Sequence, residues 1–136
     1  MAKIINWKTN ETIIEDENLS MKELVEKAVK EKISLAYAKL WCADLSNANF
    51  SGGDFRNADF DNSGLYMANF EGADLRDVNF HGTSLGDVNL RNTKLNDSTL
   101  WDADIEGVDL TGAEGIQIKQ NQLGYLLEAL GVKINY

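Results

Sequence analysis

The sequence predicts an all-β solenoid, and three observations support this fold class. Large apolar side chains recur every five residues through most of the chain. A small or modest side chain, such as Ala43 or Ala48, lies two residues before these positions. Proline is absent from all 136 residues, as expected of backbone ladders, because proline removes a ladder donor. The sixteen large apolar positions are Leu35, Leu40, Leu45, Phe50, Phe55, Phe60, Leu65, Phe70, Leu75, Phe80, Leu85, Leu90, Leu95, Leu100, Ile105 and Leu110.

The repeating unit reads small, polar, large and then two variable residues, as in residues 43–47. Neither an α-helix nor a flat strand has a period of five. If the small and large residues point inward, one unit forms a short extended edge and a turn, and four units close a square coil. Successive coils then stack about 4.8 Å apart, because each unit buries its large side chain only against its neighbours.

Residues 33 to about 114 resemble the pentapeptide-repeat family, whose motif is Ala-(Asp/Asn)-Leu-x-x. The resemblance implies a right-handed quadrilateral β-helix of about four coils. Departures from the motif fall at the polar position and leave the inward positions intact. They are Lys39, Gly64, Ser84, Lys94 and Thr99.

Residues 1–32 are expected to form an N-terminal cap made of a β-hairpin and a helix. Apolar residues on both sides of residues 9–11 predict the hairpin. Ser20 and Glu23 form a capping-box pattern, which predicts a helix from Met21 to about Lys30. The side chains expected to pack on the first coil are Leu24, Val25, Ala28 and Val29.

Residues 115–136 are expected to form a C-terminal cap made of a helix and a short strand. Leucines spaced for one helical face precede Gly131, which is a stop signal. Alternation of Val132, Ile134 and Tyr136 with polar residues predicts the strand. The helix carries more apolar surface than a lid needs, and the resemblance also implies dimerisation there. The predicted interface of a homodimer is Leu123, Leu126, Leu127 and Leu130.

Composition narrows the class of protein. A chain of 15.1 kDa is expected to form one domain, and its single cysteine, Cys42, excludes a disulfide framework. The first residues resemble neither a signal peptide nor a membrane span, so we expect a cytoplasmic protein. The net charge of −9 is concentrated in residues 33–114, which hold fourteen acids and five bases. This acidity argues against direct binding to nucleic acid or to an anionic membrane.

Stacking the sequence every twenty residues sorts the outward positions into four faces. The position after the large residue gives face 1 Trp41, Asp61, His81 and Trp101, and face 2 Ser46, Tyr66, Gly86 and Glu106. It gives face 3 Ser51, Glu71, Arg91 and Thr111, and face 4 Arg56, Arg76, Asn96 and Ile116. The polar position adds Asp44 and Asp104 to face 2, and Asp54 and Asp74 to face 4. On face 4, the arginines beside Asp54, Asp74 and Asp77 predict a neutralised ladder of ion pairs.

These faces predict no catalytic, metal or cofactor site, and we expect no enzyme. His81 is the only histidine; we interpret it as a solvated side chain, with a contact to Asp61 as the alternative. We interpret Cys42 as a half-buried thiol rather than a nucleophile. Paired aspartates need no metal to explain them, because Asp is the usual residue of the polar position. A phosphate-binding loop, HExxH and CxxC are all missing.

The leading hypothesis is that the acidic tube docks onto a protein partner with a basic surface. Duplex DNA carries one charge per ~1.7 Å, and the charge density of residues 33–114 is of the same order. The resemblance implies such DNA mimicry, because pentapeptide-repeat inhibitors of type II topoisomerases are understood to act this way. A topoisomerase-type or defence-type target would fit. The candidate acidic residues are Asp44, Asp59, Asp61, Asp87, Asp102, Asp104 and Glu106.

The alternative hypothesis is a scaffold module that recognises a protein partner through apolar side chains. Trp41, Tyr66, Met67 and Trp101 all fall at positions predicted to point outward, and large exposed aromatic residues anchor interfaces. The two tryptophans could instead be covered by the terminal helices. In the scaffold reading the acids serve only turns and solubility, so binding would depend little on salt, whereas a mimic would lose affinity steeply.

Overall fold

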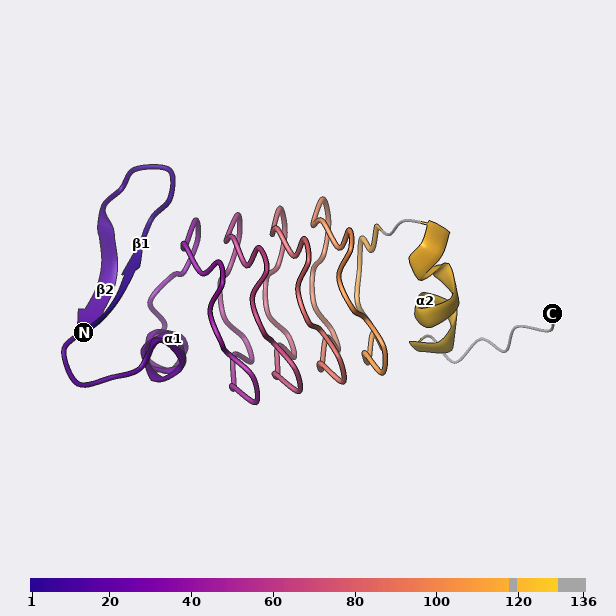
Figure 1. The fold of residues 1–136 in the computed structure, drawn as a ribbon, viewed down its shortest axis with the longest axis horizontal. Helices are drawn as coiled ribbons and strands as arrows, with labels where there is room; N and C mark the ends of the chain where they lie inside the picture. Colours follow the sequence, from indigo (N-terminus) through magenta and orange to yellow (C-terminus); the bar gives the residue numbers. More distant parts are fainter. Residues whose placement is uncertain (118–119, 130–136) are drawn as a thin grey trace.

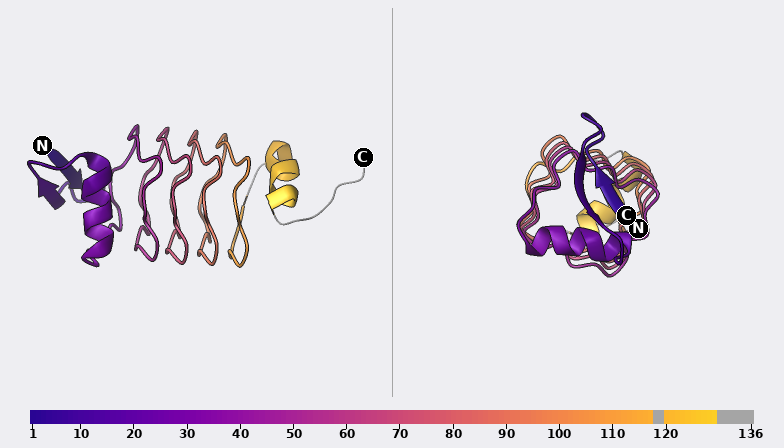
Figure 2. Two further views of the ribbon diagram at one scale, coloured as in Figure 1. Left: turned by 90° about the horizontal axis from the view of Figure 1, so that it is seen from below. Right: turned by 90° about the vertical axis from the view of Figure 1, so that its left-hand side faces the viewer.

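The computed structural model describes residues 1–117 and 120–129, and its main feature is a regular tube (Figure 1). Parallel bridges join residues twenty apart, from Lys39 with Asp59 to Lys94 with Glu114. Each bridge is isolated, because a five-residue unit turns before it can extend into a strand. The predicted period of twenty residues is therefore confirmed, and viewed along the tube the coils superimpose on one outline (Figure 2).

Backbone hydrogen bonds hold each coil to the next. The N–H of Leu40 donates to the carbonyl of Asp59 at 2.8 Å, and the N–H of Asp59 donates to the carbonyl of Ala38 at 2.9 Å. A second link leaves from the turn, where the N–H of Asn47 donates to the carbonyl of Tyr66 at 2.8 Å. The same pattern recurs along the tube, so the ladder joins every coil to the next through backbone groups.

Large apolar side chains fill the interior of the tube. All sixteen predicted positions are at most 3% exposed. The five phenylalanines form one cluster in which Phe60 stacks on Phe80, with ring centroids 5.4 Å apart, and Phe50 contacts Phe70 at 5.1 Å. These are the two predicted columns. Four of the five phenylalanines thus contact a phenylalanine twenty residues away, and the twenty-residue register is correct.

The N-terminal elements lie at one end of the tube, and they form as predicted. Strand β1 (Ala2–Ile5) pairs antiparallel with β2 (Thr12–Asp16), and helix α1 (Met21–Lys30) begins with the capping box of Ser20 and Glu23. Helix α1 buries Leu24, Val25 and Ala28, while Val29 is half-buried. In the end-on view of Figure 2, the helix lies along one edge of the coil outline and the β1–β2 hairpin crosses the outline beside it.

Strand β1 leads directly into the ladder of the first coil. The N–H of Lys39 donates to the carbonyl of Ile5 at 2.9 Å, and the N–H of Trp7 donates to the carbonyl of Tyr37 at 2.9 Å. The indole N–H of Trp7 also donates to the carbonyl of Asn57 at 2.7 Å. These bonds satisfy part of the open edge that a solenoid leaves at its first coil.

The described C-terminal elements are η1 (Gln120–Gln122) and α2 (Leu123–Ala129). The side-chain amide of Gln122 is buried and donates to the carbonyls of Leu100 at 2.6 Å and Ala103 at 2.9 Å. A side chain from outside the repeat thus contacts the last coil. Leu130 and the predicted strand at Val132, Ile134 and Tyr136 lie outside the described residues. Division of the chain into segments 1–32, 33–114 and 115–136, with capping as the role of the two ends, stays a prediction.

Candidate partner-binding surface

Six of the fourteen acids in residues 33–114 hold turns. The side chain at the polar position accepts a hydrogen bond from the N–H two residues later, at 3.0 to 3.3 Å. Asparagine does this as well as aspartate, so the backbone requires the side-chain oxygen and not the charge. The residues that close such turns are Asp44, Asn49, Asp54, Asp59, Asn69, Asp74, Asn79, Asn89, Asp104 and Asp109.

The second position after the large residue adopts a left-handed backbone conformation. Its φ angle lies between 53° and 76° along the tube, a region that Gly, Asn and Asp enter at least cost. Asp77, Asp87, Asp97 and Asp102 occupy this position. Three residues in the tube depart from this rule: Tyr37, Cys42 and Met67, with φ of 61°, 55° and 57°.

At the position directly after the large residue, three acids of the tube have neither of these backbone roles. Asp61, Glu71 and Glu106 stand directly after the large residue, where no turn is capped and the conformation is not left-handed. Asp61 contacts His81, and Glu71 accepts a hydrogen bond from Asn89 at 3.4 Å. The backbone of the repeat therefore does not require an acidic residue at these three positions.

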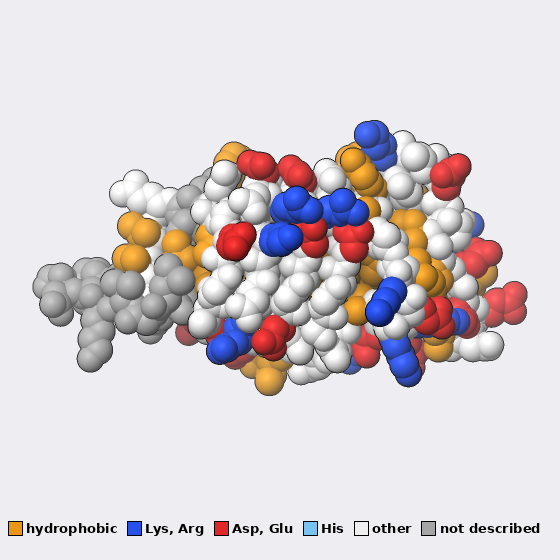
Figure 3. All heavy atoms as spheres, turned by 180° about the vertical axis from the view of Figure 1, so that it is seen from behind, with side chains coloured by type: hydrophobic (Ala, Val, Ile, Leu, Met, Phe, Trp, Pro, Cys, Tyr) orange, Lys and Arg blue, Asp and Glu red, His pale blue; other side chains and the backbone are white. Residues whose placement is uncertain are grey.

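Face 4 carries the predicted ladder of ion pairs. Arg56 Nε lies 2.8 Å from Oδ1 of Asp54 and 3.9 Å from Oδ2 of Asp74, and Arg76 Nη2 lies 2.7 Å from Oδ2 of Asp74. Hydrogen bonds from Arg56 hold the pKa of Asp54 at about 2, and those from Arg76 lower the pKa of Asp74. Asp77 stands beside this ladder, but its carboxylate is in none of these ion pairs. Figure 3 shows a side of the tube on which basic and acidic side chains are interspersed in this way.

Face 1 combines two tryptophans with a histidine between two carboxylates. Nδ1 of His81 lies 2.9 Å from Oδ1 of Asp61, and Nε2 lies 3.3 Å from Oδ2 of Asp102. The hydrogen bond with Asp61 is the main cause that raises the pKa of His81. Our interpretation of His81 as a merely solvated side chain is therefore wrong, and the alternative contact is the one formed. Nothing in the column register alone indicated Asp102, which reaches His81 from the left-handed position of the next coil.

Both tryptophans of face 1 are exposed, Trp41 by 41% and Trp101 by 50%. In the described structure the terminal helices therefore do not bury them. The ammonium of Lys39 lies 4.0 Å from the ring centroid of Trp41, a cation–π contact. Cys42 is exposed rather than half-buried as predicted, because the left-handed position next to Trp41 directs its side chain outward.

Face 2 exposes Tyr66 by 47% and Met67 by 52%. A Cβ atom added to Gly86 would lie 3.0 Å from Cδ2 of Tyr66, so the tyrosine ring rests against the backbone of the next coil. Face 2 contains no lysine, arginine or histidine, while Asp44, Asp87, Asp104 and Glu106 belong to it. The contact between Tyr66 and Gly86 was not predicted. The sequence signal for it was a glycine that follows a tyrosine by one coil in the same column.

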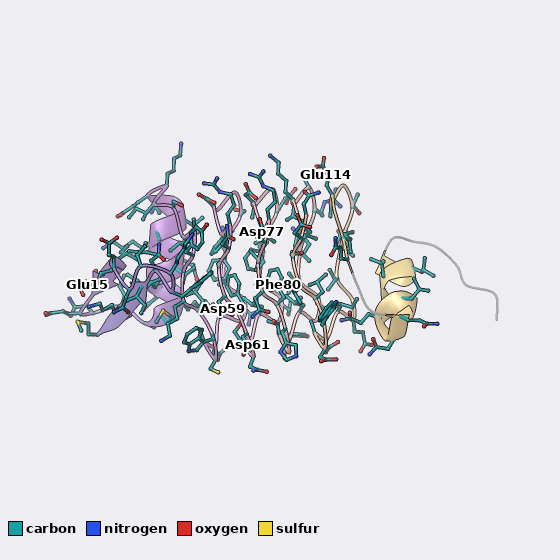
Figure 4. All side chains as sticks on the ribbon, turned by 90° about the horizontal axis from the view of Figure 1, so that it is seen from above. Glu15, Asp59, Asp61, Asp77, Phe80 and Glu114 are labelled. Atoms are coloured by element: carbon teal, nitrogen blue, oxygen red, sulfur yellow. The ribbon has the colours of Figure 1, made fainter. Side chains whose placement is uncertain are left out.

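The charges divide unevenly between the two halves of the tube surface. Faces 1 and 2 hold seven acids and, apart from His81, one base, which is Lys39; the acids are Asp44, Asp59, Asp61, Asp87, Asp102, Asp104 and Glu106. Faces 3 and 4 also hold seven acids, but with four bases, Arg56, Arg76, Arg91 and Lys94. Arg91 pairs with Asp109 at 3.3 Å. Figure 4 shows Asp59 and Asp61 on one side of the tube and Asp77 and Glu114 on the other, with Phe80 inside.

A comparison with protein families agrees with this architecture. The profile described as pentapeptide repeats (8 copies) matches residues 38–77 and 73–112, which is more than half of the chain. The chain belongs to the pentapeptide-repeat family. The tube is thus the right-handed β-helix that the resemblance implies. Among curated proteins, none matches this pentapeptide-repeat chain.

Several solved structures are similar to it. A pentapeptide repeat protein, alr5209 from Nostoc PCC 7120, is 24% identical over 75% of this chain and 82% of its own, with a TM-score of 0.48. Trypsin-treated QnrB1, a plasmid-mediated fluoroquinolone resistance protein, is 28% identical over 71% of this chain and 49% of its own, with a TM-score of 0.33. Rfr23 from the cyanobacterium Cyanothece 51142 is 26% identical over 61% and 54%, at 0.24. The match spans about half the length of the latter two, so family membership rests on the repeat profile.

The pentapeptide-repeat chain shows no metal site in its described part, where no three His, Cys, Asp or Glu side chains are grouped to hold an ion. None of the described helices has the length and apolar content to cross a membrane. Of the predicted dimer residues, Leu123 is 45% exposed, Leu126 packs against the core and Leu127 is half-buried. The homodimer through α2 stays a prediction.

Proposed function

We propose that this protein is a non-enzymatic binding module that docks faces 1 and 2 onto a basic protein surface. One observation carries the proposal: these two adjoining faces combine seven acids and a single lysine with every large apolar side chain exposed in the tube. Trp41, Tyr66, Met67 and Trp101 are those side chains. The two hypotheses drawn from the sequence thus converge on one surface, where acids provide long-range attraction and apolar groups provide anchors.

The partner favoured by this charge is a nucleic-acid-binding protein. Asp44 and Asp104 stand in one column three coils apart, which is about 14 Å. Over the same length, duplex DNA carries about eight charges on its whole circumference, and faces 1 and 2 carry seven acids on one half of theirs. A groove that accepts duplex DNA would meet a comparable field. Inhibition or modulation of such a protein, of the topoisomerase or defence type, is the proposed outcome.

The exposed thiol of Cys42 supports the cytoplasm as the proposed compartment, because reducing conditions keep such thiols free. The second candidate function is a scaffold that binds through its apolar side chains alone. The turns described above favour it, because they account for many of the acids without any partner. Salt dependence separates the two candidates: a docking surface that relies on charge loses affinity steeply as ionic strength rises.

The test uses an oligo-arginine peptide as the probe and isotope-labelled protein observed by NMR. We expect amide signals of faces 1 and 2 to shift most, and affinity to fall with added salt. Glu106→Lys on face 2 should weaken binding by roughly tenfold, whereas Glu71→Lys on face 3 should change it by about twofold at most. Both glutamates stand directly after the large residue and cap no turn, so the two variants are matched.

The proposal is overturned if the shifts spread evenly over all four faces, or if Glu71→Lys weakens binding as much as Glu106→Lys. Binding that ignores salt but disappears in Trp101→Ala would favour the scaffold function instead.

A further inference from the structure

The left-handed position of the repeat contains a residue that the fold does not favour. Met67 has a φ of 57°. Glycine reaches this region because it has no Cβ, and asparagine and aspartate reach it because their side chains are short and polar. Methionine has neither property. Asn47 occupies the same column one coil earlier with a φ of 61°. The repeat therefore provides its own better residue for this place.

Packing of the Met67 side chain does not offset the conformational cost of its left-handed backbone. The side chain of Met67 is 52% exposed, so it contributes little to the core. Tyr66, next to it, is 47% exposed and lies against Gly86 of the following coil. This contact restricts the tyrosine ring before any partner arrives, and a pre-positioned ring loses less conformational entropy on binding.

From these observations we infer that Tyr66 and Met67 are the specificity-determining anchor of the binding surface. The inference rests on the proposed function and deepens it. The partner it fits is a protein surface that places an apolar side chain on Tyr66 and Met67 and surrounds it with lysine or arginine. Charge complementarity argues for this partner, since Asp44, Asp87 and Glu106 lie on the same face and no base does.

The same charges disfavour other occupants. A second copy of the chain would bring acids against acids, and like charges across an interface reduce affinity. Nucleic acid would be repelled for the same reason. An uncharged apolar partner would leave the carboxylates around the anchor without counter-charges.

Met67→Asn tests the inference, because it leaves the charge of the surface unchanged. Two peptides serve as probes: an alternating arginine–leucine peptide and an oligo-arginine peptide. We expect Met67→Asn to lower the affinity for the arginine–leucine peptide by about fivefold, which is the loss expected of an interface anchor. Its affinity for oligo-arginine should not change. The melting temperature should rise by about 2–6 °C, because the backbone strain is relieved.

The reciprocal variant Asn47→Met is the control for the fold: it should lower the melting temperature without replacing Met67 in binding. Equal affinity of wild type and Met67→Asn for the arginine–leucine peptide would overturn the inference, even if Glu106→Lys still weakened both peptides and upheld the proposed function. Loss of both peptide affinities in Met67→Asn would also overturn it, since the effect would then not be specific to the apolar contact. A dimer of wild type that Met67→Asn converts to a monomer in sedimentation would identify a second copy as the occupant, and would overturn the assigned partner.

Discussion

Inner and outer positions of the tube follow different rules. The inner positions repeat one chemistry in every coil, and all sixteen large residues are buried. The outer positions repeat a backbone conformation but not a chemistry: one column runs from Trp41 through Asp61 and His81 to Trp101. The repeat therefore constrains the inside by packing and the outside only by turns, and the outside is where one pentapeptide-repeat protein differs from another.

Outer positions can be sorted further by the residue types that their backbone conformation and turn hydrogen bonds favour. The polar position favours a side-chain oxygen that accepts a hydrogen bond, and the left-handed position favours Gly, Asn or Asp. A residue that meets these needs tells little about function. A residue that ignores them, such as Met67, or that stands where no need exists, such as Glu106, is informative about a partner.

The largest effect is expected inside the tube. Phe70 contacts four other phenylalanines, at centroid distances from 5.1 Å to 6.3 Å, and is fully buried. Phe70→Ala should lower the free energy of unfolding by about 3–5 kcal/mol, because it leaves a cavity that neighbouring coils cannot fill. Denaturant unfolding followed by tryptophan fluorescence measures the loss.

The matched outer variant is Tyr66→Ala, which removes an aromatic ring of similar size from an exposed position. Its cost in unfolding free energy should stay within about 0.5 kcal/mol. Similar costs for the two variants would contradict the division between inner and outer positions.

A smaller effect is expected at the polar position. Oδ1 of Asp104 accepts a hydrogen bond from the N–H of Glu106 at 3.1 Å. Asp104→Ala removes the acceptor and should cost about 0.5–1.5 kcal/mol of unfolding free energy. Asp104→Asn keeps an acceptor, as Asn49 does in its own turn, and should cost much less. Thermal unfolding of the two variants side by side measures this difference, and equal costs would mean that charge, not the turn, matters here.

The inner positions of the tube were predictable from sequence because every repeat unit keeps a large apolar residue at the same place. A large apolar residue every five positions has one packing solution, and it correctly placed Phe60 over Phe80. The capping box at Ser20 predicted the start of α1 for a similar reason, since the two side chains act within one turn. Gln122 shows where this reasoning ends. It lies outside the repeat, and only the folded chain brings its amide to the carbonyls of Leu100 and Ala103.

The candidate surface was only partly predictable. Column stacking placed Trp41, Tyr66 and Glu106 on adjoining faces, because it needs only the period. It could not tell that Cys42 is exposed, or that His81 reaches Asp102, since both depend on how a left-handed turn directs its side chain. The contact of Tyr66 with Gly86 required the two coils in space.

The smallest effect is expected at His81, where an outer position gains a pH dependence. Both ring nitrogens donate only in the protonated form, so the imidazolium matches the carboxylates of Asp61 and Asp102. The pKa of His81 is raised in the folded protein, chiefly by the hydrogen bond with Asp61. A raised pKa means that the stabilisation is complete below the unfolded value, near 6.5, and is lost as pH rises through the folded value. The melting temperature should therefore decrease slightly as the pH is raised above this value, and His81→Gln should remove that step.

NMR titration of the single histidine provides the direct measurement. Asp61→Asn should lower the pKa of His81 more than Asp102→Asn does. A wild-type pKa at or below the ordinary value would contradict the paired arrangement.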